Sequence, residues 1–189
     1  MSVSMQDVRS RFDLWFRELE PICRTANPWG FLCLSALIDY LSRLATNPGK
    51  PGRKHYIDFI ARYFPNEYRD FRYKNGETDL PKQMYYILRN GLVHSFSLIP
   101  DERATRSGGR PRSIVLMHSE EATRKGLHHL QNCSGPQGIL DAALFIAEDL
   151  LSDARIAADN LLTEATPGSV IENNVLSWFA KYPPITGHP

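Results

Sequence analysis

Apolar side chains recur every three to four residues through most of this sequence, and that spacing constrains the fold more than any other feature. It is the period of an amphipathic α-helix with one face buried. The first such pattern, Phe12, Trp15, Phe16 and Leu19, ends near Pro21. Breaks at Pro, Gly and Asn separate the later patterns. They predict further helices over 28–46, 56–64, 80–96, 119–131, 139–162 and 170–179.

A different pattern follows the helix at 80–96. Two short runs, 96–100 and 113–118, flank the polar segment DERATRSGGRPR and predict a small β-hairpin insertion around 96–118. The fold class is therefore mainly all-α: a helical bundle over about 28–162, the hairpin, and a C-terminal helix over 168–182. With 189 residues and no repeat or linker, the chain is interpreted as a single domain over 1–189.

Composition limits the ligands and the cellular location that can be expected for this chain. The 22 basic and 21 acidic residues nearly cancel, so any contact with nucleic acid must come from a local patch. Cys23, Cys33 and Cys133 have no metal-ligand spacing, and neither do the histidines, so no metal and no cofactor are expected. The sequence has no signal peptide and no stretch long enough to span a bilayer. We therefore expect a reduced cytoplasmic protein with no membrane contact.

The helix predicted at 80–96 is apolar on every side, yet it contains Arg89, Asn90 and His94. At about 100° per residue, Asn90 and His94 share one face of an α-helix and Arg89 lies between them. Polar groups on such a helix are costly unless they are paired or line a cleft. Gly91 adds a cost of roughly 1 kcal/mol against alanine within a helix. Polar residues and a glycine thus interrupt an apolar helix within six positions, and such a group of exceptions indicates a functional site.

The string Arg-Asn-Gly-Leu-Val-His at 89–94 resembles the Arg-x(4–6)-His motif of HEPN domains, including the polar residue after the arginine. The resemblance implies a compact α-helical bundle, and many such domains are metal-independent endoribonucleases of toxin–antitoxin, CRISPR and RNA-processing systems. It also implies that two protomers bring their motifs together in one cleft. Arg89 and His94 would then be catalytic, with Asn90 supporting them.

The residue types suit RNA cleavage by the ribose 2′-hydroxyl. Histidine transfers protons near neutral pH, and arginine offers a planar pair of donors to phosphate oxygens. One histidine per chain is short of an acid–base pair, and a homodimer would supply the second. Asp39, a lone carboxylate on an apolar helix, is expected to pair with Arg89 or to orient the motif. In the structural alternative, Arg89 pairs with Asp39 and His94 is a core histidine.

Other basic residues give weaker signals. The hairpin tip contains arginines that either contact an RNA backbone or form a solvated loop: Arg103, Arg106, Arg110 and Arg112. Arg124 and His129 repeat the motif spacing on what is expected to be an ordinary surface helix. The sequence thus predicts a HEPN-like endoribonuclease acting as a homodimer on RNA, with an antitoxin or other protein as a further partner. The alternatives are a non-catalytic HEPN-like module, for dimerisation or for binding nucleotide, RNA or protein, and a structural helical module.

Overall fold

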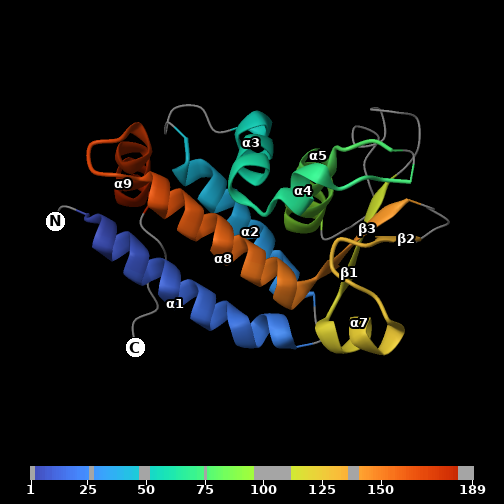
Figure 1. Ribbon diagram of the computed structural model, residues 1–189. Coiled ribbons are helices and arrows are strands. Elements are labelled where there is room, and N and C mark those ends of the chain that lie inside the picture. Colours follow the sequence, from blue (N-terminus) through green and yellow to red (C-terminus); the bar gives the residue numbers. More distant parts are fainter. Residues whose placement is uncertain are drawn as a thin grey trace.

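The computed structural model describes residues 3–25, 28–46, 52–74, 76–95, 112–135 and 141–182. Most of these residues are helical and a small sheet accompanies them, which confirms the predicted mainly-α fold class (Figure 1). The helices are α1 (Met5–Arg24), α2 (Trp29–Leu44), α3 (Arg53–Tyr63), α4 (Asn66–Asp70), α5 (Leu80–Gln83), η1 (Met84–Ser95), α7 (Ser119–Lys125), α8 (Ala147–Glu164) and α9 (Val170–Lys181). The strands are β1 (Ser113–Met117), β2 (Asn132–Cys133) and β3 (Ala142–Ile146).

Three long helices form the body of the molecule. Helices α1 and α8 lie side by side, and α2 packs against both of them (Figure 1). Helix α9 packs at one end of this group, while the sheet and α7 lie at the other end. Helices α3 and η1 both contact α2, which brings the Arg89 segment against the middle of the bundle.

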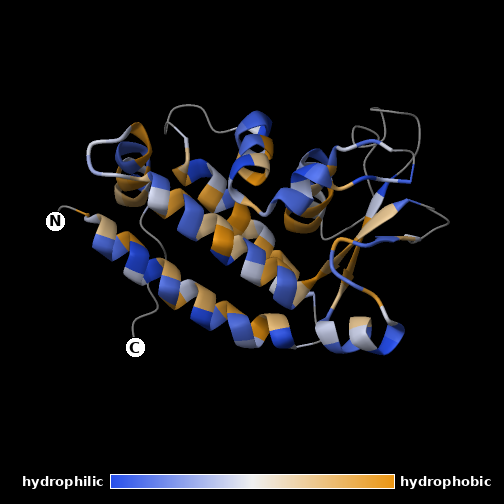
Figure 2. Ribbon diagram, in the orientation of Figure 1, coloured by the Kyte–Doolittle hydropathy of each residue, from blue (hydrophilic) through white to orange (hydrophobic). Residues whose placement is uncertain are grey.

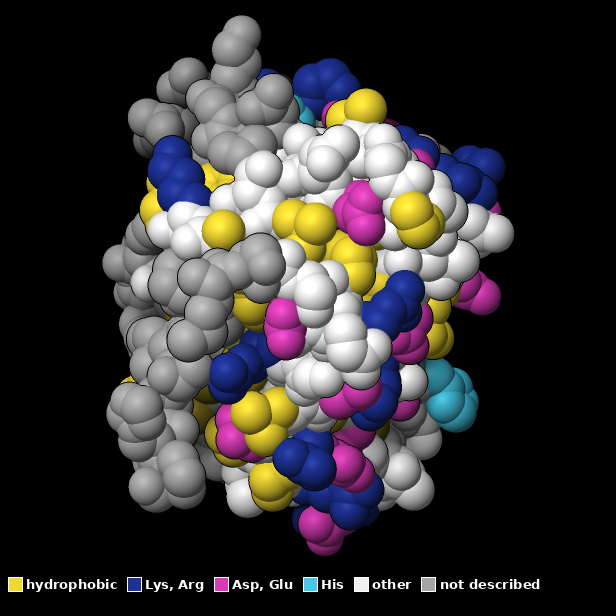
Figure 3. Space-filling view, turned by 90° about the vertical axis from the view of Figure 1, so that its left-hand side faces the viewer, with side chains coloured by type: hydrophobic (Ala, Val, Ile, Leu, Met, Phe, Trp, Pro, Cys, Tyr) yellow, Lys and Arg dark blue, Asp and Glu magenta, His cyan; other side chains and the backbone are white. Residues whose placement is uncertain are grey.

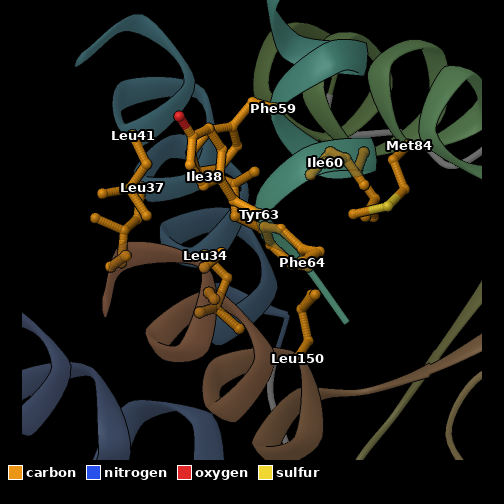
Figure 4. Packing of buried hydrophobic residues seen from close by; sticks show 14 of the residues in the cluster. Leu34, Leu37, Ile38, Leu41, Phe59, Ile60, Tyr63, Phe64, Met84 and Leu150 are labelled. Atoms are coloured by element: carbon orange, nitrogen blue, oxygen red, sulfur yellow. The ribbon is translucent and has the colours of Figure 1, made fainter. Parts of the chain in front are cut away.

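The hydrophobic core lies where these helices meet. Leu34 and Ile38 of α2, Ile60 of α3, Leu150 of α8 and Met84 of η1 are fully buried in one cluster (Figure 4). Apolar positions gather on the central helices and strands in Figure 2, and hydrophilic positions on the outer surfaces. The predicted amphipathic patterns therefore bury their apolar faces against one another, which is the main stabilising contribution to such a bundle.

The sheet contains pairings that the predicted hairpin does not include. Strand β1 pairs in parallel with β3, with Ser113 opposite Ala142 and Met117 opposite Ile146, and β2 pairs antiparallel with β3. The predicted strand at 113–118 is confirmed as β1. Its predicted hairpin partner, 96–100, lies outside the described residues, so that pairing stays a prediction.

The predicted helix at 139–162 is wrong in its first part, because Ala142–Ile146 is strand β3 and the helix begins at Ala147. All five residues of β3 are buried. A strand covered on both faces has a continuous apolar sequence, and such a run cannot be told from a buried helix by its periodicity. Helix α1 also continues past Pro21 to Arg24, with Cys23 buried in the core.

The surface mixes charges of both signs. Figure 3 shows one face of the molecule, on which basic and acidic side chains alternate with small apolar groups. None of the helices in the described part of the chain combines the length and the hydropathy that a bilayer-spanning segment needs.

Candidate functional site

The segment that contains the Arg89 motif is a π-helix rather than the predicted α-helix. Its backbone hydrogen bonds span five residues instead of four, an irregular geometry that recurs at functional sites. The five-residue separation of Arg89 and His94 equals this repeat, so the two backbone positions lie one turn apart along η1. The structure describes His94 through its backbone position.

Arg89 is held by polar groups on two sides. Its Nε donates to Asp39 Oδ1 at 3.2 Å, and its Nη1 donates to Asn90 Oδ1 at 2.8 Å. The guanidinium also lies 5.6 Å from the ring centroid of Tyr85. The side chain is 20% exposed. The predicted contact between Asp39 and Arg89 is confirmed, and Asn90 is placed as a residue that orients the arginine.

Asp39 joins two arginines. Its Oδ2 accepts from Nε of Arg43 at 3.1 Å and from a terminal nitrogen of the same guanidinium at 3.0 Å. Arg43 lies one turn further along α2, so the i, i+4 spacing places the two side chains on one face of that helix. Within the part of the chain that the structure describes, one carboxylate thus faces two guanidinium groups, which leaves an excess of positive charge there.

A small cavity of about 130 Å³ opens beside these residues, at the junction of α2, α3 and η1. We call it the Arg89 cavity. The described residues that line it are Asp39, Ser42, Arg43, Gly52, His55, Tyr85 and Arg89. His55 is the residue that the sequence analysis missed. It lies on α3, just before the apolar positions 56–64 that predicted this helix and outside the motif. Only the packing of α3 against α2 and η1 brings it to Arg89.

A buried tyrosine, Tyr56, packs against Tyr85, one of the residues that line the cavity. Tyr56 follows His55 on α3, and its ring centroid lies 5.6 Å from that of Tyr85. Burial raises the pKa of the Tyr56 hydroxyl far above its usual value; the Asp39 carboxylate raises it further and the Arg89 guanidinium lowers it. The hydroxyl therefore stays protonated at neutral pH.

Arg112 does not lie at an exposed hairpin tip, which corrects the interpretation of this residue as an RNA contact. It is 3% exposed, it pairs with both Glu77 and Asp79, and its guanidinium lies 4.3 Å from the Tyr73 ring centroid. An arginine so enclosed has a structural role. The other arginines of that prediction, Arg103, Arg106 and Arg110, lie outside the described residues.

The second Arg–His pair is not a repeat of the motif. Helix α7 ends at Gly126, which takes a left-handed conformation with φ +64°, so Arg124 and His129 do not share a helix. The predicted helix over 119–131 is therefore too long. His129 instead lies against α8, at the edge of a cavity of about 810 Å³.

Both ring nitrogens of His129 have partners. Nδ1 accepts from the Ile146 backbone N–H at 2.9 Å, and Nε2 lies 3.0 Å from the Tyr68 hydroxyl. That hydroxyl donates to Asp153 at 2.7 Å, and the carboxylate lies 3.3 Å from Nε2. Because Nδ1 acts as an acceptor, the ring is neutral with its proton on Nε2. Neither nitrogen is left to act on a substrate, so His129 connects β3, α4 and α8 structurally.

Replacing His129 with alanine should therefore lower the free energy of unfolding by about 1–3 kcal/mol, the cost of leaving buried hydrogen-bonding groups without a partner. Urea denaturation measures this change. The adjacent His128 is exposed and provides the matched control, since His128→Ala removes no side-chain hydrogen bond that the structure shows. Equal stabilities of the two variants would contradict the structural role of His129.

Comparisons of the chain with protein-family models, with curated proteins and with solved structures find no match. Within the described residues, no group of three or more His, Cys, Asp or Glu side chains is arranged to hold a metal ion.

Proposed function

We propose that this protein is a HEPN-like, metal-independent endoribonuclease that acts as a homodimer. Its substrate is RNA, and the attacking group is the ribose 2′-hydroxyl. In this reaction O2′ loses its proton to a base and bonds to phosphorus. The P–O5′ bond breaks, and O5′ takes a proton from an acid. The products are a 2′,3′-cyclic phosphate and a 5′-hydroxyl end.

The observation that carries the proposal is the state of Arg89. Its guanidinium is fixed from two sides by Asp39 and Asn90, yet the side chain remains partly exposed beside a cavity. A fixed guanidinium loses little conformational freedom when it binds a phosphate, and its charge favours the extra negative charge that develops in the transition state. His94, one π-helical turn away along the backbone, is assigned the proton transfer.

The test is cleavage of a labelled RNA by the purified protein, with EDTA present. Product ends are analysed by phosphatase sensitivity and mass, because a 2′,3′-cyclic phosphate distinguishes attack by the ribose from attack by water. The decisive variants are considered in the Discussion.

A homodimer is part of this proposal because one motif supplies one histidine. On η1, Leu92 is buried in the core, whereas Val93 is 37% exposed. An apolar side chain exposed next to the motif favours a two-fold contact on the Val93 side of η1. We expect sedimentation equilibrium at micromolar concentration to give twice the chain mass of 21.5 kDa. Val93→Glu should shift the protein toward the monomer, whereas Ile156→Glu, an exposed control on α8, should not. A wild-type protein that sediments only as a monomer would contradict the dimer.

A non-catalytic HEPN-like module is the second candidate. The observation in its favour is that Arg89 already has an ion pair with Asp39 and a hydrogen bond to Asn90. Such contacts are also what a purely structural arginine would make. RNA binding without cleavage would favour this candidate over the ribonuclease.

A further inference from the structure

The Arg89 cavity has the chemistry of an anion site. Two guanidinium groups, from Arg43 and Arg89, reach its wall from α2 and η1, and Asp39 is the carboxylate that the described residues place against both of them. Among the described residues, positive charge is therefore in excess on this wall. A wall with such an excess attracts a negatively charged ligand.

The N-terminus of α3 faces the same cavity. Gly52, which precedes the helix, lines the cavity, and among the described residues no side chain caps the first turn. The first backbone N–H groups of a helix have no partner within the helix and, together with the helix dipole, favour an anion. This feature comes from a different element than the two arginines, and it indicates the same ligand charge.

His55 supplies the third observation. It lies in the first turn of α3 and lines the cavity, and its Nδ1 atom is buried with no hydrogen-bond partner among the described residues. A buried ring nitrogen without a partner is costly, and a ligand would satisfy it. Protonated histidine donates hydrogen bonds from both nitrogens and adds a positive charge that phosphate oxygens favour.

We propose that the Arg89 cavity binds one phosphate group, held by Arg43, Arg89, the N-terminus of α3 and His55. The volume of about 130 Å³ limits the ligand, because drug-sized molecules occupy pockets of roughly 300 Å³ or more. A single phosphate fits while the nucleosides on either side remain outside. The inference rests on the proposed function only in assigning that phosphate to an RNA backbone. It adds a second histidine, His55, to the site that the same chain builds from Arg89 and His94.

The binding test uses inorganic phosphate and NMR of the histidine rings in the wild-type protein, with the His55 signals assigned from the His55→Gln spectrum. Phosphate should shift the His55 signals and leave those of the exposed His128 unchanged. Replacing Arg43 with Gln, or His55 with Gln, should weaken binding about tenfold, the effect of losing one charge-assisted hydrogen bond. Absence of any saturable shift at His55 would overturn the proposal.

A variant at Gly52 tests the site without disturbing the core. A Cβ atom built on Gly52 has no heavy atom within 4 Å, and its φ of −168° is ordinary extended backbone. Gly52→Asp would place a carboxylate over the first N–H groups of α3, where aspartate is a preferred cap. It should abolish phosphate binding while preserving stability. Gly52→Asn, of the same shape without the charge, should reduce binding less. Wild-type affinity in Gly52→Asp would refute the site.

RNA separates this inference from the proposed function. If phosphate binds as expected but no RNA is cut, the ribonuclease proposal fails and the phosphate site stands. If RNA is cut in a manner that depends on His94, while Gly52→Asp and His55→Gln cut as fast as the wild type, the phosphate site is refuted and the ribonuclease stands. If both hold, Gly52→Asp should reduce cleavage as well as binding.

Discussion

Replacing His94 with alanine should reduce RNA cleavage by about 10²–10⁴-fold, the usual contribution of a positioned proton-transfer group. Arg89→Ala should reduce it by a similar factor of about 10²–10³, because the developing charge on the phosphate loses its guanidinium. Arg89→Lys should remain impaired, since an ammonium group cannot reproduce the planar pair of donors. Initial rates on a labelled RNA, with EDTA present throughout, measure all three effects.

The contacts around Arg89 indicate that the protein stays folded when this arginine is replaced. Asp39 retains its contacts with Arg43 when Arg89 is replaced, and it is 24% exposed, so no isolated buried charge is left behind. We therefore expect Arg89→Ala to fold and to keep the unfolding midpoint within a few degrees of the wild type. Exposed His128→Ala is the control for histidine removal. If the wild type cuts RNA and His94→Ala cuts it equally fast, the assignment of the motif is wrong. If the wild type cuts no RNA, the non-catalytic module becomes the leading function.

Replacing Arg112 with methionine should lower the free energy of unfolding by about 1–3 kcal/mol, because the buried guanidinium loses its charge-assisted hydrogen bonds to Asp79 and Glu77. Methionine keeps most of the apolar contact with Tyr73 but leaves Asp79 and Glu77 without their cation. The effect is large because Arg112 connects the start of β1 to the segment that precedes α5. Urea denaturation monitored by circular dichroism provides the measurement.

Arg124→Met is the matched control for this prediction, since Arg124 is exposed on α7 and has no ion pair that the structure shows. Its replacement should change stability by no more than about 0.5 kcal/mol. A change below 1 kcal/mol for Arg112→Met would contradict the structural role. A loss of RNA affinity with unchanged stability would restore Arg112 as a nucleic-acid contact.

The helices with a polar and an apolar face could be predicted from the sequence, because their periodicity records directly which side is buried. Helices α2, α3 and α9 lie close to the predicted ranges for this reason. Strand β3 was predicted as part of a helix because a run of five buried apolar residues has no polar positions to reveal its period. The π-helical form of η1 was not predicted either, since the apolar residues around Arg89 favour a buried helix without setting its hydrogen-bond repeat.

Some residues of the candidate site could be predicted from the sequence, and others could not. The sequence by itself determined that Arg89, Asn90 and His94 share one helix, and that Asp39, a charge within an apolar helix, needs a partner. Only the tertiary structure decided that Arg43 and His55 join them, because His55 is separated from Arg89 by more than thirty positions and meets it through the packing of α3. It also showed that Arg112, which was predicted to lie at a hairpin tip, is buried. Local patterns record which side chains avoid water, whereas the identity of their neighbours depends on how the helices pack.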